Sequence, residues 1–96
     1  MTYVFHPEAL DEYLGAVSWY ADISPELAHS FIEAIESGME RIRTSPEAWH
    51  PVRDDIRRHL IRRFPYGIYY RIAQDRIEIL AVLHASRDPD FWRGRM

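Results

Sequence analysis

The sequence predicts an α+β domain in which a hairpin of two helices packs on a curved, mainly antiparallel sheet. Two segments of the first half carry apolar residues at helical spacing, and three later segments are rich in Ile, Val, Leu and Tyr. A short β-forming segment precedes the helices. In the resulting order, β-α-α-β-β-β, the helices cover one face of the sheet and leave the other face open, where we expect function to reside.

Length and composition predict a single domain over residues 1–96. A chain of 96 residues with 47% hydrophobic content can bury one core. Cysteine is absent, which excludes disulfides and thiolate metal ligands and favours a reducing compartment. The first residues lack the pattern of a signal peptide, and no segment is long enough to span a membrane. We therefore expect a cytoplasmic protein with no metal and no cofactor.

The first half predicts one strand and the first helix. Residues 2–5 are β-formers, and the strand should end at His6-Pro7, where proline suits the first turn of a helix. Apolar residues then recur at helical spacing until the helix stops near Asp22. The stripe that we expect to be buried is Leu10, Tyr13, Leu14, Val17, Tyr20 and Ala21.

The second helix is predicted from its capping residues. Ser24 is a good N-cap, Pro25 suits the first helical position, and Thr44-Ser45-Pro46 should end the helix. Its expected buried stripe is Leu27, Phe31, Ile35, Gly38, Met39 and Ile42. Glu33, Glu36 and Glu40 should form its solvated face.

The second half predicts a loop followed by three antiparallel strands. Residues 46–56 show no clear period and are expected to form the loop. The strands should span residues 58–63, 68–72 and 76–84, with short turns between them. In the last strand, Ile77, Ile79, Ala81 and Leu83 should share one face, and Glu78, Leu80, Val82 and His84 the other. Because its middle is apolar on both faces, this strand should be central.

The net charge of −3 hides an asymmetry between the two parts of the chain. Residues 1–40 carry eight acids and no basic residue, a charge of −8, whereas residues 41–96 carry twelve basic residues and seven acids, a charge of +5. All twelve are arginine, whose planar guanidinium grips carboxylates and phosphates in two places. The second part can thus bind anions, but no lysine is available as a base.

Three local motifs, in this order of elements, resemble the ParE/RelE toxin superfamily over the whole chain. The first is Trp19-Tyr20 with Leu27-Ala28 and Phe31, and the second is the segment from Phe64 to Arg71, FPYGIYYR. The third is the segment from Val82 to Pro89, VLHASRDP, with Trp92, which resembles ParE-like members in particular.

This resemblance implies a toxin of a type II toxin-antitoxin system that a cognate, ParD-like antitoxin wraps and silences. A ParE-like member is expected to inhibit DNA gyrase by binding, and to meet operator DNA only through the antitoxin. The alternative is a RelE-like endonuclease that cuts mRNA on the ribosome. A third possibility is a non-toxic member that acts only in antitoxin binding and operon repression.

Comparison with the RelE type disfavours cleavage. Arg58 stands where the resemblance expects one catalytic lysine and Leu60 where it expects the other. Gly67 replaces the first arginine and Arg87 matches the second, while Phe91 or Trp92 stands near the expected tyrosine. With one or two of about five groups retained, a binder is favoured over an enzyme.

A second ribonuclease type would use glutamate, arginine and histidine. His84 could carry a proton with help from Glu78 and Arg87. However, Glu78 and His84 are six residues apart on one predicted strand, roughly 20 Å. If the chain were a ribonuclease, its catalytic residues would be Arg58, His84 and Arg87; otherwise, His84 is a strand-end residue bonded to the tail.

Two surfaces are predicted to bind proteins. We expect the target to contact Arg87, Trp92, Arg93 and Arg95, unless these form only a solvated tail. We expect the antitoxin to contact Trp19, Arg58, Arg62, Tyr69 and Arg71. Trp19 falls off the main helical stripe, and its alternative role is packing on the helical hairpin. Tyr69 and Arg71 should share the open face of the sheet beside Arg58 or Arg62.

Overall fold

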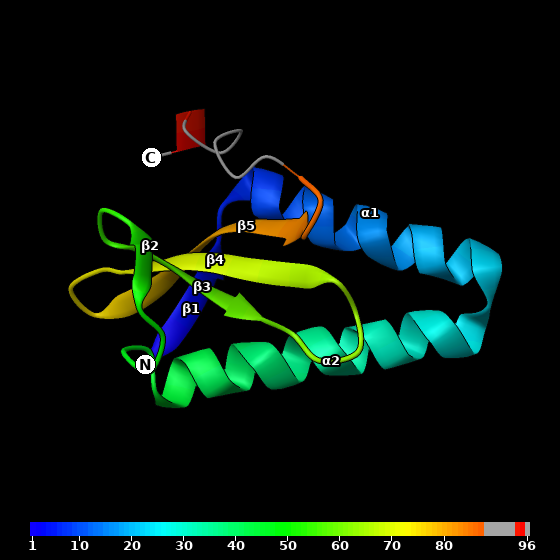
Figure 1. Ribbon diagram of the computed structural model, residues 1–96, viewed down its shortest axis with the longest axis horizontal. Helices are drawn as coiled ribbons and strands as arrows, with labels where there is room; N and C mark the ends of the chain where they lie inside the picture. The colour runs from blue at the N-terminus through cyan, green and yellow to red at the C-terminus, as the bar shows by residue number, and fades with distance from the viewer. Residues whose placement is uncertain (88–93, 96) are drawn as a thin grey trace.

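The computed structural model describes residues 1–87 and 94–95. These residues form β1 (Thr2–Phe5), α1 (Pro7–Ile23), α2 (Pro25–Thr44), β2 (Pro51–Arg53), β3 (Ile56–Leu60), β4 (Tyr66–Ile72) and β5 (Arg76–His84). The helices form a hairpin on one side of the sheet, as Figure 1 shows. The predicted α+β class and order of elements are confirmed, with β2 as an added short strand.

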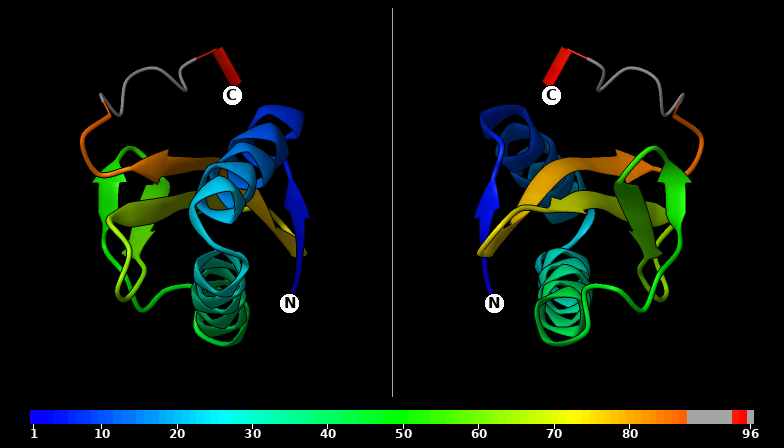
Figure 2. Two further views of the ribbon diagram at one scale, coloured as in Figure 1. Left: turned by 90° about the vertical axis from the view of Figure 1, so that its right-hand side faces the viewer. Right: turned by 90° about the vertical axis from the view of Figure 1, so that its left-hand side faces the viewer.

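The sheet is mixed and twisted. Its strand order is β1-β5-β4-β3-β2. β1 pairs with β5 in parallel, and the other neighbours are antiparallel. Figure 2 looks along the helices, which lie one above the other beside the twisted strands. β5 lies between β1 and β4, which confirms the prediction that the last strand is central.

Capping residues define the helices where the sequence predicts them. The Nδ1 atom of His6 accepts a hydrogen bond from the Glu8 N–H (3.1 Å) at the start of α1. The Ser24 N–H donates to the Tyr20 carbonyl (2.9 Å) and ends α1. The Ser24 hydroxyl oxygen accepts from the Leu27 N–H (3.0 Å) and starts α2. Ser24 is therefore the only residue between two helices that each begin with proline.

The main core lies between the helices and the sheet. The predicted stripe of α2 is largely confirmed, because Phe31, Ile35, Gly38, Met39 and Ile42 are buried and Leu27 is half-buried. The predicted stripe of α1 is partly wrong. Leu10 is 40% exposed and Leu14 is 55% exposed, whereas Ala9, Tyr13 and Ala16 are buried. Small alanines on both sides of Tyr13 form the contact face, and each leucine lies one residue, about 100°, farther around the helix.

The boundaries of the middle strands differ from the prediction. The predicted loop, residues 46–56, contains β2, which pairs with β3 through an irregular register. β3 starts at Ile56, not at residue 58, and it ends at Leu60. The chain then turns, because Arg63 adopts a left-handed backbone with φ 71° and the Ile61 N–H donates to the Tyr66 carbonyl (3.0 Å). β4 consequently starts at Tyr66, two residues earlier than predicted.

A β-bulge in β5 changes which of its residues face the helices. Tyr69 pairs with Ala81 while Tyr70 pairs with Ile79, so Leu80 is an extra residue in the ladder. Ile77, Ile79 and Val82 therefore all belong to the core beneath the helices. The predicted alternation, which placed Val82 opposite Ile77 and Ile79, is wrong for this reason.

The face of the sheet away from the helices carries a second, smaller core. Its members are all nearly inaccessible: Ile56, Tyr69, Leu80, Ala81 and Leu83. The expectation of an entirely open face is therefore wrong for this part of the sheet. None of the helices in the described ranges is long and apolar enough to cross a membrane.

Candidate functional site

One end of the sheet concentrates positive charge. The Ala85 N–H donates to the Pro65 carbonyl (2.6 Å), which holds the turn between β3 and β4 beside the end of β5. The two segments that meet here, residues 56–69 and 79–87, contain no acidic residue. Their exposed arginines, which we name the basic end, are Arg58, Arg62, Arg63 and Arg87. An acidic partner would find complementary charge here.

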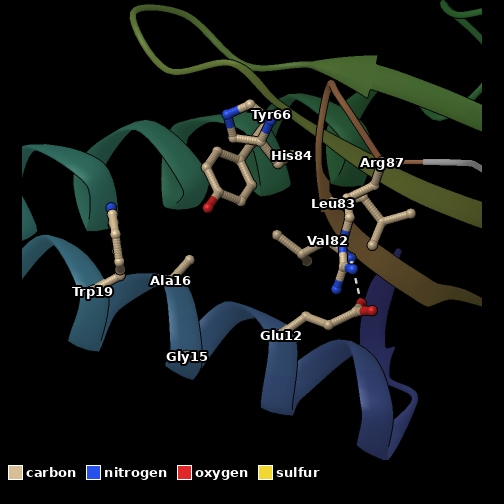
Figure 3. Close-up of a pocket in the computed structure, with 9 residues that line it drawn as sticks. All are labelled: Glu12, Gly15, Ala16, Trp19, Tyr66, Val82, Leu83, His84 and Arg87. Carbon is tan, nitrogen blue, oxygen red and sulfur yellow. Dashed lines mark hydrogen bonds between the residues drawn. The ribbon is translucent and has the colours of Figure 1, made fainter.

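A groove opens between α1 and the end of β5, beside the basic end. We name it the edge groove; its volume is about 350 Å³. Its lining comes from α1, the start of β4 and the end of β5, as Figure 3 shows: Glu12, Gly15, Ala16, Trp19, Tyr66, Val82, Leu83, His84 and Arg87. The volume lies near the lower end of the roughly 300–1,000 Å³ that is usual for ligand sites.

The floor and wall of the groove combine apolar surface with fixed polar groups. A Cβ atom added at Gly15 would meet no atom within 4 Å, so this position leaves space in the groove. Trp19 is 66% exposed at the mouth of the groove. Glu12 is held in place, because its Oε1 atom accepts a hydrogen bond from the Val82 N–H (3.0 Å). Arg87 points into the groove toward Glu12 (Figure 3).

Tyr66 and His84 form the upper wall. Their rings meet edge to face with centroids 5.2 Å apart. Burial raises the pKa of the Tyr66 hydroxyl, Tyr20 raises it further, and Arg87 partly offsets the rise. Tyr66 is therefore protonated near neutral pH and can donate a hydrogen bond.

The hydrogen bonds of His84 limit its chemistry. Its Nδ1 atom accepts from the Ser86 N–H (3.1 Å) and lies 2.8 Å from the Ser86 hydroxyl oxygen. In the neutral ring the proton must then sit on Nε2, which can donate a hydrogen bond but cannot accept a proton. Glu78 lies at the opposite end of the ladder, because it pairs with Arg71 while His84 pairs with Tyr66. The structure does not bring Glu78 and His84 together.

The residues predicted to bind the antitoxin divide between two places. Trp19 lines the edge groove, and Arg58 and Arg62 belong to the basic end. Arg62 lines a separate hollow with Arg63, Ser30 and Glu33, and so does not lie beside Arg71.

Tyr69 and Arg71 occupy different surroundings from those predicted. Tyr69 is buried in the second core. Arg71 is bonded to Glu78, with Nη2 2.7 Å from Oε1, and this hydrogen bonding keeps the pKa of Glu78 below its usual value. Of the two arginines predicted beside this pair, Arg58 does lie opposite Tyr69 in the β3–β4 ladder, whereas Arg62 lies elsewhere. The predicted patch is open only in part, because Tyr69 is buried.

The residues predicted to bind the target are also separated. Arg87 belongs to both the basic end and the edge groove. Trp92 and Arg93 lie outside the described residues. The Arg95 side chain is only 3% exposed, and its guanidinium binds Glu8 (2.6 Å) and Glu12 (2.7 Å). Its charge faces inward, toward α1, in this arrangement.

Sequence reasoning missed three residues of the groove. Glu12 lies off the predicted apolar stripe of α1, Tyr66 falls in a turn between two predicted strands, and nothing in the predicted pattern singles out Gly15. The glycine in the middle of a predicted helix was an available signal, since glycine weakens a helix and often marks a packing or functional need. Among residues 1–87 and 94–95, no three metal-ligating side chains come together.

Comparisons with known proteins agree with this architecture. Residues 3–89 match the family described as the ParE toxin of the type II toxin-antitoxin system, parDE. The chain belongs to this ParE toxin family. Toxin ParE2 of Mycobacterium tuberculosis strain CDC 1551 / Oshkosh and Toxin ParE2 of strain H37Rv are each 33% identical to it over 89 residues. Each alignment covers 88% of this chain and 82% of the relative.

A solved structure shares the ParE fold. The chromosomal ParDE TA system from P. aeruginosa contains a chain that superimposes with a TM-score of 0.75 at 17% identity. The match covers 88% of this chain and 95% of that chain. Membership of the ParE family in the type II toxin-antitoxin class, expected from the sequence, is thus confirmed.

Proposed function

We propose that this ParE-family toxin acts in the cytoplasm by binding DNA gyrase through the basic end, and that a ParD-like antitoxin neutralises it. The four exposed arginines of the basic end belong to the two segments that the hydrogen bond between Ala85 and Pro65 holds together, and this arrangement is the observation that carries the proposal. Such a surface suits contact with a large acidic partner, since complementary charge raises both the association rate and the specificity.

The geometry of His84 favours binding over cleavage. A ribonuclease needs a base to activate the ribose hydroxyl and an acid to protonate the leaving oxygen. With Nδ1 of His84 engaged by Ser86, the other ring nitrogen of the neutral ring carries the proton and offers no lone pair. Arg58 and Arg87 can stabilise a phosphate charge, but neither arginine transfers protons near neutral pH.

A supercoiling assay tests the target. Purified gyrase should be inhibited by the wild-type chain, and Arg87→Ala should weaken this inhibition roughly tenfold or more. Arg76→Ala is the matched control, because it removes the same charge at the other end of β5. Equal loss in both variants would point to net charge, not to the basic end, as the cause.

Two further outcomes would contradict the proposal. Induced expression that leaves growth unaffected would favour a member that acts only in antitoxin binding and operon repression. Transcripts cut on the ribosome by the wild-type chain, and intact with a folded His84→Ala variant, would establish an mRNA endonuclease. In that case His84 would be a catalytic residue despite its hydrogen bonds to Ser86.

Co-purification tests the antitoxin. The chain should form a stable complex with the protein encoded beside its gene, and the complex should restore gyrase activity. A toxin that still inhibits gyrase at saturating concentrations of that protein would rule out this partner.

A further inference from the structure

A small hollow lies between α2 and the turn that joins β3 to β4. We name it the turn hollow; its volume is about 210 Å³, and it is lined by Ser30, Glu33, Ala34, Arg62 and Arg63. This volume is below the roughly 300–1,000 Å³ of sites that enclose a whole small molecule. The turn hollow is therefore suited to a small ion or to one chemical group of a larger ligand.

The backbone at Arg63 directs two adjacent arginines into the same hollow. In an extended chain, successive side chains point to opposite sides. Arg63 instead adopts a left-handed backbone with φ 71°, and both Arg62 and Arg63 line the turn hollow. This conformation is unfavourable for a residue with a Cβ atom, whereas glycine adopts it readily. The chain thus carries an arginine where glycine would fit with less strain, and such strain is concentrated at functional sites.

The turn is held in place against the helix. The Ile61 N–H donates to the Tyr66 carbonyl (3.0 Å), and the Tyr66 N–H donates to the Phe64 carbonyl (2.8 Å). The Phe64 ring meets the Phe31 ring edge to face with centroids 5.2 Å apart, which fixes the turn beside α2. Ser30 directly precedes Phe31 on that helix. The groups that line the turn hollow are therefore carried by elements that are already positioned, which lowers the entropy lost when a ligand binds.

The donors of the turn hollow are not used elsewhere in the described part of the chain. Within residues 1–87 and 94–95, the Ser30 hydroxyl has no hydrogen bond, and Arg62 and Arg63 have no ion pair. The carboxylate of Glu33 is engaged by His29, with an Nε2–Oε1 distance of 2.6 Å, and not by the arginines. Two guanidinium groups and a hydroxyl group therefore remain available to an anion.

This set of donors suits a phosphate group. Each guanidinium is a planar fork that can bind two oxygens of an anion. A carboxylate has a single charge and two oxygens, which one arginine satisfies. A phosphate monoester carries a charge of about −1.5 to −2 at pH 7 and three acceptor oxygens. Two arginines and a hydroxyl group therefore match a phosphate better than a carboxylate, in charge and in number of donors.

We propose that the turn hollow binds a phosphate group, either free phosphate or the terminal phosphate of a nucleotide, between Arg62, Arg63 and the Ser30 hydroxyl. This inference goes beyond the proposed function, because binding of phosphate requires neither gyrase nor an antitoxin. Arg62 and Arg63 are also two of the four arginines of the basic end. A bound phosphate would consequently lower the positive charge of that surface.

Titration of the purified chain with inorganic phosphate at constant ionic strength tests the site. Bound phosphate should raise the Tm and shift the side-chain N–H signals of Arg62 and Arg63 in NMR spectra, with a Kd of about 1 mM. Arg62→Ala should raise this Kd roughly tenfold or more. Arg76→Ala is the matched control, because Arg76 pairs with Glu78 and does not line the turn hollow. Its Kd should equal that of the wild type.

Arg63→Gly separates the loss of a ligand group from a loss of folding. Glycine keeps the left-handed backbone without strain but removes the guanidinium. This variant should have a Tm equal to or above that of the wild type, yet bind phosphate roughly tenfold more weakly. Glu33→Gln should act in the opposite direction and lower the Kd about twofold, since it removes a negative charge from the lining. An unchanged Kd in both Arg62→Ala and Arg63→Gly would overturn the proposal.

Three further ligands identify the source of the phosphate. Equal Kd values for AMP and inorganic phosphate would support a site for the phosphate group alone, and tighter binding of AMP would support a nucleotide. Succinate, a dianion without phosphate, should bind much more weakly; equal binding would show only a general attraction of anions and contradict the proposal. Duplex DNA with 5′-hydroxyl ends provides phosphodiesters alone. If DNA binds more tightly than AMP, and Arg58→Ala weakens it as much as Arg62→Ala, the arginines form a nucleic-acid surface and the proposal fails.

All of these measurements use the purified chain without gyrase or antitoxin. A failure to bind phosphate would therefore leave the proposed function standing, and a failure to inhibit gyrase would leave the phosphate site standing.

Discussion

Among the described residues, His59 is a buried polar residue whose ring has an unsatisfied hydrogen-bonding atom. It is 5% exposed, and its ring meets the Trp49 ring edge to face with centroids 4.3 Å apart. Its Nδ1 atom has no hydrogen-bond partner in the described part of the chain. Burial lowers the pKa of His59, and the positive charge of Arg41 lowers it further. The native fold therefore favours the neutral ring.

Stability should fall as the solution becomes mildly acidic. In the unfolded chain His59 should titrate near pH 6.5, whereas its native pKa is lower. Between these two values the unfolded state binds more protons, so the free energy of unfolding decreases as the pH falls through about 6.5 and levels off below the native pKa. Urea unfolding between about pH 5 and pH 8 measures this slope. His59→Leu should flatten it, while His50→Ala, a change at an exposed residue, should not.

Two glycines in helices should respond differently to the same substitution. Gly15→Ala should stabilise the fold by about 1 kcal/mol, because alanine favours the helix and the new methyl group meets no neighbour. At Gly38 the same atom would lie 3.1 Å from His59 and Ile68, both buried. We expect crowding to cancel or reverse the gain there. Chemical denaturation compares the stability of the two variants. Equal stabilisation would show that His59 and Ile68 move aside for the new methyl group at little cost.

At the scale of elements, the hairpin depends on one residue that serves both helices. The backbone N–H of Ser24 ends α1, and its hydroxyl caps α2. The two roles use different atoms, so a substitution can remove one and keep the other.

Ser24→Ala should therefore destabilise the protein by about 1 kcal/mol through α2 alone. The N–H that ends α1 remains, but the Leu27 N–H loses its 3.0 Å acceptor. Ser37→Ala, at an exposed position inside α2, should be neutral or slightly stabilising because alanine is the better helix former. Thermal unfolding of the two variants checks this difference. If both variants had the same Tm, the hydroxyl of Ser24 would not stabilise α2.

The sequence predicted the helices better than the strands for a physical reason. Caps such as Ser24 and Pro25 act locally, within one turn, so their signal is readable in the chain itself. The extra residue at Leu80 depends on pairing with β4, a partner that local sequence does not reveal. Every residue from Ile79 to Leu83 is apolar, so no alternation marked the bulge.

The site was less predictable than the fold, because it is assembled from distant segments. The arginines of the basic end are visible in the sequence as charged residues. Their two segments lie side by side because the Ala85 N–H donates a hydrogen bond to the Pro65 carbonyl. The role of Glu12 depends on Val82, seventy residues away in sequence. Composition indicated an anion-binding half of the chain, and only the fold brings four of its twelve arginines to one end of the sheet.

At the scale of the whole molecule, Arg95 joins the C-terminal region to α1 and β5. Its guanidinium donates to Glu8 (2.6 Å), to Glu12 (2.7 and 2.8 Å) and to the Leu80 carbonyl (3.1 Å). The side chain of Glu12 is 15% exposed, so the pair is largely shielded from water. Such a pair matters most when one member is removed and the other is left uncompensated.

Arg95→Met should thus be destabilising, by about 3 kcal/mol, because Glu12, which is 15% exposed, would lose the guanidinium that binds both of its oxygens. The double variant Arg95→Met with Glu12→Gln should lose less stability than the sum of the losses of the two single variants. Glutamine at position 12 removes the buried negative charge and keeps an oxygen that accepts from the Val82 N–H. Arg76→Ala, at a side chain 51% exposed, should change stability by less than about 1 kcal/mol. A double-mutant cycle by urea unfolding measures the coupling; strict additivity would show that the two residues act independently.

The extra residue at Leu80 is not needed to aim the later part of β5. If Leu80 were deleted, Ala81 would follow Ile79 directly and keep Tyr69 as its partner, and Val82 would still face the helices. What such a deletion would remove is the Leu80 carbonyl that accepts from Arg95 at 3.1 Å, so a shortened β5 should keep the edge groove but loosen the attachment of the C-terminal region.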